Sequence, residues 1–187
     1  AAGRSDVGLL REHNEDSFAA LDEYGLYIVA DGMGGHRGGD VASRLVIETV
    51  VDVIRACADD EVTVPFDVDP SLTEQGNFLR YSIILANRHV LVRSEREPAC
   101  RGMGSTVVAA LFSPKNKQIT IAHVGDSRCY RFRAGNIEQL TLDHSLLNEY
   151  KLAIPNLTEE QIREIPSNVI TRAIGMRGAV QVDILCD

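Results

Sequence analysis

Apolar residues along the chain recur at two spacings, which predict where the strands and helices lie. Alternating or continuous apolar runs predict strands, whereas apolar residues three and four positions apart predict amphipathic helices. The predicted strands cover residues 27–30, 105–112, 118–124, 127–133, 136–140 and 180–185. The predicted helices cover residues 40–59, 71–94 and 146–152, with a further short helix after Thr158. Short joints between the four consecutive strands after Pro98 predict antiparallel pairing.

The second long helix has a start signal and an apolar side in the sequence. Ser71 and Glu74 match a capping box, in which the two side chains satisfy main-chain amides at the start of a helix. Phe78, Tyr81 and Leu85 fall on one side of this helix, and that side is expected to pack on a core.

The stretch from Tyr27 to Asp40 joins an apolar strand, a carboxylate and several glycines. Asp31 stands where the strand ends, so its side chain can leave the sheet and face a ligand. Gly32 and Gly34 remove side chains around it and let the backbone approach a cation or a phosphate. The same residues also suit an ordinary strand-to-helix turn with Asp40 as the N-cap. Both interpretations remain open at this level.

Two further places carry candidate site carboxylates. The segment from Arg11 to Asp16 is dense in charge, although a solvated polar loop would have the same composition. A predicted hairpin turn at 22–25 would bring Asp16 next to Asp31, at the ends of neighbouring strands. Asp126 lies on a tight corner between two predicted strands, where either a ligand or a plain hairpin turn would fit.

Composition narrows the class of protein. With 187 residues and 44% hydrophobic content, the chain is expected to form a single globular domain over residues 1–187. A net charge of −8 argues against nucleic acid or an anionic membrane as the partner. No apolar run is long enough to span a membrane, and the N-terminus lacks the layout of a secretion signal, so we expect a cytoplasmic protein.

The residues that bind metals in other proteins point here to oxygen ligands. The four cysteines are widely separated and form no Cys-x-x-Cys pair, so the sequence suggests neither a zinc ribbon nor a disulfide framework. The five histidines are scattered, and no His-Glu-x-x-His motif is present. Carboxylates gathered at one site would instead suit hard cations such as Mg²⁺ or Mn²⁺.

Five blocks in order resemble the metal-dependent type-2C serine/threonine protein phosphatases, in their bacterial form; they are 8–18, 29–36, 104–106, 122–128 and 169–175. The resemblance implies an α+β fold, a four-layer α-β-β-α sandwich with two central antiparallel sheets flanked by helices. The polar segment 145–167 is interpreted as a surface flap. The family's later Asp-Gly and Asp-Asn blocks have no counterpart here, so we expect a C-terminally incomplete domain with impaired metal binding.

The resemblance also implies roles for individual residues. Asp31 corresponds to the carboxylate that bridges two Mn²⁺ or Mg²⁺ ions, and Gly32 to the residue whose carbonyl binds one of them. Asp16 would act through metal-bound water, and Asp126 would bind a third metal ion. Arg11 corresponds to the arginine that holds the substrate phosphate. The implied reaction is hydrolysis of phosphoserine or phosphothreonine in a phosphoprotein by a metal-bridging water, opposing a cognate serine/threonine kinase.

At three positions the resemblance does not assign a definite role. Met33 stands where eukaryotic relatives place a histidine as general acid, so protonation of the leaving group is unassigned. His36 is close in sequence but fits a structural role equally well, and Glu15 corresponds to a residue that makes outer contacts in some relatives. A catalytically silent phosphatase-like module that binds a phosphoprotein or another partner is the alternative function.

Overall fold

The computed structural model describes residues 1–34, 38–59, 68–115 and 117–187. In chain order its elements are β1 (Asp16–Leu21), β2 (Leu26–Met33), α1 (Gly38–Ala58), α2 (Glu74–Arg96), a 3-10 turn (Pro98–Cys100), β3 (Gly104–Ser105), β4 (Val107–Ser113), β5 (Gln118–Val124), β6 (Tyr130–Arg133), β7 (Asn136–Gln139), α3 (Leu146–Ala153), α4 (Glu159–Glu164) and β8 (Asp183–Cys186). The main sheet is antiparallel in the order β1-β2-β4-β5-β8, with the short β3 beside β2.

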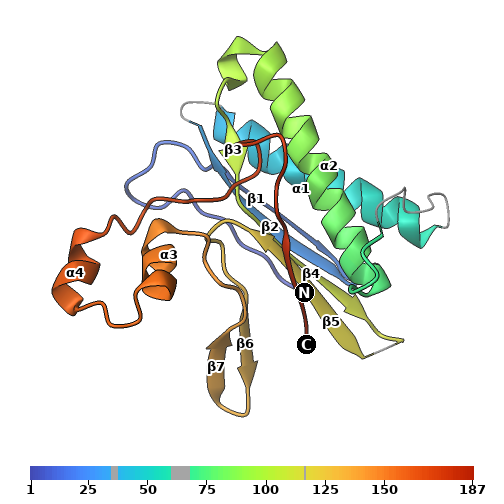
Figure 1. Cartoon of the computed structure of the whole chain (residues 1–187). Coiled ribbons are helices and arrows are strands. Elements are labelled where there is room, and N and C mark those ends of the chain that lie inside the picture. The colour runs from blue at the N-terminus through green and yellow to red at the C-terminus, as the bar shows by residue number, and fades with distance from the viewer. Residues whose placement is uncertain (35–37, 60–67, 116) are drawn as a thin grey trace.

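Helices α1 and α2 cover one face of this sheet (Figure 1). Alternation along β2 shows which face is covered, because Leu26, Ile28 and Ala30 are buried in the core whereas Val29 and Asp31 are exposed. We call the face that carries Val29 and Asp31 the open face. The core therefore lies between one side of the sheet and the two long helices, and the candidate carboxylate Asp31 points away from it.

Helix α2 forms where the sequence predicts it, but it buries a different side. The buried aliphatic residues are Leu79, Ile83, Ala86 and Val90. The predicted stripe of Phe78, Tyr81 and Leu85 is only half-buried at the edge of the contact. The predicted face was wrong because α2 packs on α1 and on the sheet together, and this double contact buries the side that carries Leu79, Ile83 and Val90.

The starts of both long helices also differ from the prediction. Helix α1 begins at Gly38, so Asp40 lies inside the first turn and is not the N-cap. The N-cap of α2 is Thr73, whose Oγ1 accepts the Gly76 N–H at 3.1 Å. The predicted capping box at Ser71 was wrong, because the Ser71 hydroxyl donates to Asp69 Oδ1 at 2.6 Å instead.

The four consecutive strands predicted after Pro98 do not form one meander. Strand β5 pairs with β4 on one side and with β8 on the other, while β6 pairs with β7 in a separate two-stranded sheet. Because β8 occupies the second edge of β5, the Gly125–Asp126 joint does not close a hairpin within the described residues. The hairpin interpretation of Asp126 was wrong, and the chain leaves the sheet at this corner.

The mixed α and β architecture with antiparallel sheets is confirmed. The described residues form one large sheet and the small β6–β7 hairpin, so the second central sheet of the expected sandwich stays a prediction. Helices α3 and α4 lie apart from the main sheet and bury none of their residues (Figure 1). Among the described residues, no helix combines the length and the apolar character that a membrane span needs.

Candidate metal centre

Strand register places two carboxylates side by side at one end of the open face. Asp16 is the direct partner of Asp31 in the β1–β2 pair, as the predicted hairpin at 22–25 requires. On the other side, Thr106 binds the main chain of Asp31 twice. Its N–H donates to the Asp31 carbonyl at 2.8 Å, and its Oγ1 accepts the Asp31 N–H at 3.0 Å. Asp16, Asp31 and Thr106 therefore form one row across three adjacent chain segments.

Asp126 joins this row from β5. The strand ends at Val124, and the Ser127 hydroxyl lies 2.6 Å from Thr106 Oγ1. Thr106 thus contacts both the main chain of Asp31 and the residue after Asp126. The carboxylates come from β1, β2 and the end of β5, which are far apart in the sequence.

The electrostatics of Asp31 show which predicted residues the fold brings together. Burial raises the pKa of Asp31 above its ordinary value, and the carboxylates of Asp16, Asp126 and Glu15 raise it further. The Arg11 guanidinium acts in the opposite direction and lowers it. The other predicted charged residues therefore all lie within electrostatic reach of Asp31, and their catalytic roles stay predictions.

This donor set fits divalent cations. Asp31 reaches solvent, yet the surrounding protein removes part of its hydration and sets it among like charges. Among the described residues whose charges act on Asp31, Arg11 is the cation that opposes this repulsion. Carboxylate and carbonyl oxygens are the ligands that Mg²⁺ and Mn²⁺ prefer, and a bound cation would remove the repulsion.

Gly32 brings helix α1 into contact with the end of β2. A Cβ on Gly32 would lie 2.0 Å from the Gly39 carbonyl oxygen, so only glycine allows this approach. The Gly32 N–H donates to the Glu15 carbonyl at 3.1 Å. The glycine therefore serves the strand-to-helix packing, and its predicted role as a carbonyl ligand stays a prediction. His36 lies outside the described residues.

Sequence reasoning missed a buried histidine cluster beside this row. His123 and His144 stack with ring centroids 4.7 Å apart and an angle of 13°, and His144 Nε2 lies 3.2 Å from Asp183 Oδ2. Burial lowers the pKa of His144. Burial alone would raise the pKa of Asp183, but hydrogen bonds from His144 and Arg172 lower it. The sequence signal for this cluster was limited to the Asp143-His144-Ser145 run directly before the predicted helix 146–152.

This cluster is a poor metal site despite its three candidate ligands. Nitrogen lone pairs lie in the ring plane, and two nearly parallel stacked rings cannot direct their lone pairs at one ion. In addition, the Arg172 guanidinium donates to Asp183 and lies 3.0 Å from His144 Nε2. A fixed positive charge at this point opposes a cation, so the expectation of oxygen ligands is retained.

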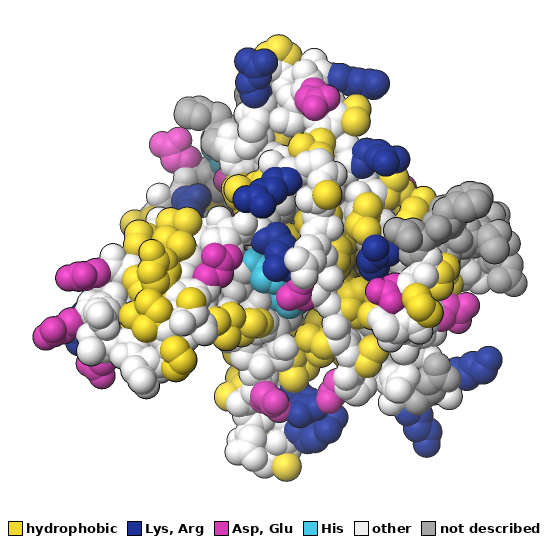
Figure 2. Space-filling model, viewed as in Figure 1, with side chains coloured by type: hydrophobic (Ala, Val, Ile, Leu, Met, Phe, Trp, Pro, Cys, Tyr) yellow, Lys and Arg dark blue, Asp and Glu magenta, His cyan; other side chains and the backbone are white. Residues whose placement is uncertain are grey.

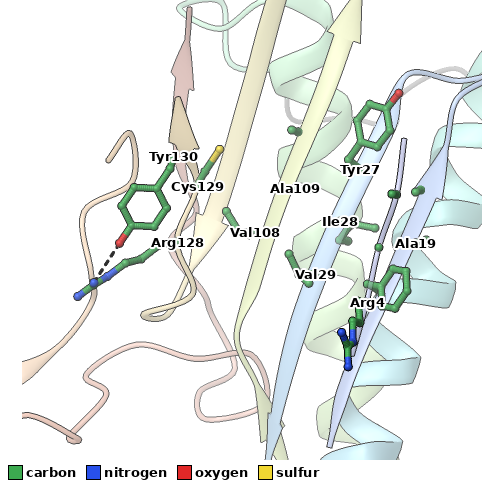
Figure 3. Close-up of a pocket in the computed structure, with 15 residues that line it drawn as sticks. Arg4, Ala19, Tyr27, Ile28, Val29, Val108, Ala109, Arg128, Cys129 and Tyr130 are labelled. Atoms are coloured by element: carbon green, nitrogen blue, oxygen red, sulfur yellow. Dashed lines mark hydrogen bonds between the residues drawn. The ribbon is translucent and has the colours of Figure 1, made fainter. Parts of the chain in front are cut away.

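A cavity lies elsewhere on the open face. It has a volume of about 330 Å³ and lies between β1, β2, β4 and the segment that enters β6 (Figure 3). Val29, Val108 and Cys129 line it, and Arg128 donates to the Tyr130 hydroxyl at 3.1 Å at its edge. No carboxylate lines it within the described residues, so it does not contribute to the candidate metal centre.

Comparison with known proteins identifies the family. The sequence profile described as protein phosphatase 2C matches residues 11–173. This chain belongs to the protein phosphatase 2C family. The serine/threonine phosphatase Stp of Listeria welshimeri is 38% identical over 184 residues, which cover 96% of this chain and 68% of that protein.

Solved structures of this phosphatase family share the fold. The crystal structure of the serine/threonine phosphatase PstP/Ppp of Mycobacterium tuberculosis superimposes with a TM-score of 0.78 at 31% identity, covering 98% of this chain and 71% of that one. The catalytic domain of PstP in complex with two manganese ions has a TM-score of 0.71 at 31% identity, covering 97% and 70%. The resemblance to bacterial type-2C phosphatases is thus confirmed, and the silent binding module is not favoured.

Proposed function

We propose that this phosphatase hydrolyses phosphoserine and phosphothreonine in phosphoproteins with two Mn²⁺ or Mg²⁺ ions and a third ion at Asp126. The observation that carries the proposal is the meeting of Asp16, Asp31, Asp126 and Arg11 at one end of the open face. The PstP catalytic domain with two manganese ions supports the choice of cation.

In this proposal the residues divide the work by position. Asp31 would hold two ions because it lies between Asp16 on β1 and the corner that carries Asp126. Gly32 would offer its carbonyl at the end of the same strand. When bound, the cations would supply a water of lowered pKa as the nucleophile and would neutralise phosphate charge.

Arg11 would orient the phosphate. Its side chain is exposed, and its charge acts on Asp31 against three carboxylates. A phosphate dianion approaching this end of the sheet meets net negative charge unless cations and Arg11 oppose it. The planar guanidinium can donate two parallel hydrogen bonds to phosphate oxygens, which fixes the direction of the scissile bond.

Other parts of the proposal concern the surroundings of the site. The segment 145–167 would form a surface flap, since α3 and α4 bury no residue and Tyr150, Leu152 and Ile154 are exposed. Figure 2 shows apolar side chains gathered over α3 and α4. We also propose that residues 1–187 form a single domain with the four-layer sandwich. We further propose that the protein is cytoplasmic and that a kinase opposes it.

The function is tested by measuring hydrolysis of p-nitrophenyl phosphate and of a phosphothreonine peptide with Mn²⁺, with Mg²⁺ and with EDTA. We expect turnover of both substrates with Mn²⁺ and none with EDTA. Turnover that is equal in EDTA, or the absence of turnover together with absent Mn²⁺ binding, would contradict the proposal.

Substitution of Arg11 by alanine is expected to raise KM for the phosphopeptide about 10- to 100-fold while changing kcat little, because a charged hydrogen-bond donor to the phosphate is lost. Steady-state kinetics at saturating Mn²⁺ measure both constants. Arg4→Ala is the matched control, since Arg4 is an exposed arginine paired with Asp6. An unchanged KM in the Arg11 variant would exclude the phosphate role.

A further inference from the structure

His144 holds the residue that precedes Asp126 at both of its main-chain polar groups. The His144 N–H donates to the Gly125 carbonyl at 3.0 Å, and His144 Nδ1 accepts the Gly125 N–H at 3.0 Å. The side chain of His144 is only 7% exposed. A single buried residue therefore holds the backbone at the point where the chain leaves β5.

Gly125 has little freedom to move, because it lies between His144 and Thr106. Its φ of +108° lies in the region that favours glycine, and a Cβ there would lie 2.7 Å from the Thr106 side chain. Ser127, on the other side of Asp126, contacts Thr106 Oγ1 at 2.6 Å. Asp126 is thus flanked by two anchored residues: Gly125 is held by His144 and lies close to Thr106, and Ser127 contacts the Thr106 hydroxyl. Thr106 also binds the Asp31 main chain.

The contacts of His144 define its tautomer. Because Nδ1 accepts the Gly125 N–H, it carries a lone pair, and the neutral ring must carry its proton on Nε2. That proton points to Asp183 Oδ2 at 3.2 Å. Arg172 donates to the other oxygen of Asp183, and its 3.0 Å approach to Nε2 joins two donors and is no hydrogen bond. Asp183 and Arg172 together keep Nδ1 free to accept.

Neighbouring segments hold the ring in place from the other sides. His123 stacks on it, and His123 Nε2 lies 2.9 Å from the Leu142 carbonyl. The His144 carbonyl accepts the Thr171 N–H at 2.9 Å. Figure 2 shows histidine side chains next to basic and acidic ones near the middle of the view. The ring is therefore fixed in orientation before any ligand binds.

We infer that His144 is a positioning residue for the metal site: through Nδ1 it holds the Gly125–Asp126 corner so that the Asp126 carboxylate faces Asp31. Asp183 and Arg172 act behind it by keeping the proton on Nε2. The metal role of Asp126 in this inference rests on the proposed function. The part in which His144 holds the Gly125–Asp126 corner rests on geometry alone.

Two variants distinguish the role of His144 Nδ1 from that of Nε2. In His144→Asn, the amide oxygen can reach the position of Nδ1 and accept the Gly125 N–H. In His144→Gln, the longer side chain reaches the position of Nε2 and Asp183, and leaves the Gly125 N–H without its acceptor. Both variants lose the stacked ring, so the loss of ring packing is common to them and is checked by thermal unfolding.

Two measurements are made on the wild type and on both variants. Amide hydrogen exchange followed by NMR reports the Gly125 N–H, and electron paramagnetic resonance of free Mn²⁺ reports metal binding. In His144→Gln we expect Gly125 exchange to be about 10-fold faster and Mn²⁺ binding at the weakest site to be about 10-fold poorer, as for the loss of one buried hydrogen bond. His144→Asn should stay near the wild type in both. Asp126→Asn identifies the binding step that depends on Asp126.

Each outcome decides the inference. Equal hydrogen exchange of the Gly125 N–H in the two variants would overturn the claim that His144 Nδ1 holds the Gly125–Asp126 corner. Different exchange with identical Mn²⁺ binding would overturn the link to Asp126. Failure of the wild type to bind Mn²⁺ at all would contradict the proposed function, and the exchange rates alone would then decide whether His144 holds the corner.

Discussion

Replacement of Asp31 by asparagine is expected to lower Mn²⁺-dependent turnover by about 100- to 1000-fold, the size of effect seen when one charge-stabilising group is removed from an active site. Asp31 is the carboxylate on which Asp16, Asp126 and Arg11 all act, so it lies at the centre of the charge cluster. Asparagine keeps the shape of the side chain but removes the charge that two cations would share. Steady-state kinetics with the phosphothreonine peptide measure the loss.

The same substitution is expected to stabilise the metal-free chain at neutral pH. The folded state raises the pKa of Asp31 above its unfolded value. The contribution of Asp31 to folding stability is therefore fully present below the unfolded pKa and is lost as pH rises through the folded pKa. Asparagine does not ionise, so the variant escapes this loss. Thermal unfolding in EDTA should give a higher Tm than the wild type at pH 7, and added Mn²⁺ should raise the wild-type Tm more.

Asp52→Asn is the matched control for both measurements, since Asp52 is an exposed carboxylate on α1 and is not among the charges that act on Asp31. It should leave turnover and Tm near the wild type. Near-normal turnover of Asp31→Asn would show that the metal centre lies elsewhere. A lower Tm in EDTA would show that the carboxylate repulsion at Asp31 is compensated in the folded chain.

Replacement of Gly32 by alanine is expected to lower the free energy of unfolding by about 3 kcal/mol, at the upper end of overpacking costs. The new Cβ would lie 2.0 Å from the Gly39 carbonyl oxygen and 2.8 Å from the Glu15 carbonyl oxygen. Both obstacles are backbone atoms, which cannot turn away as the end of a side chain can. Relief requires α1 to move off the end of β2, which also displaces Asp31.

Urea unfolding measures this loss, which corresponds to a Tm lowered by about 6 to 12 °C for a chain of this size. Gly178→Ala is the control, because a Cβ there meets no atom within 4 Å. It should change stability by no more than about 0.5 kcal/mol. A Gly32 variant as stable as the control would show that the contact between α1 and β2 is looser than described.

Local sequence signals predicted the elements and part of the site. Turn residues at 22–25 predicted the hairpin that brings Asp16 next to Asp31, and the β1–β2 register then placed the two residues opposite each other. The capping residue and the buried side of α2 were predicted wrongly. Several hydroxyl residues precede that helix, and its two apolar sides compete for burial. Only contact with α1 and the sheet selects Leu79, Ile83 and Val90 for the core.

The sequence by itself determined the strand and helix content and the oxygen-rich character of the candidate site, because these depend on residue types and on spacings shorter than about one helix or hairpin. It also determined the family, because five short motifs occur in the same order along the chain. The tertiary structure alone decided that β8 takes the second edge of β5, that Asp126 leaves the sheet at that corner, and that His144 holds Gly125 there. These features join residues up to 66 positions apart. Pairing at such separation depends on which strand edge and which side chain remain available after the core has packed.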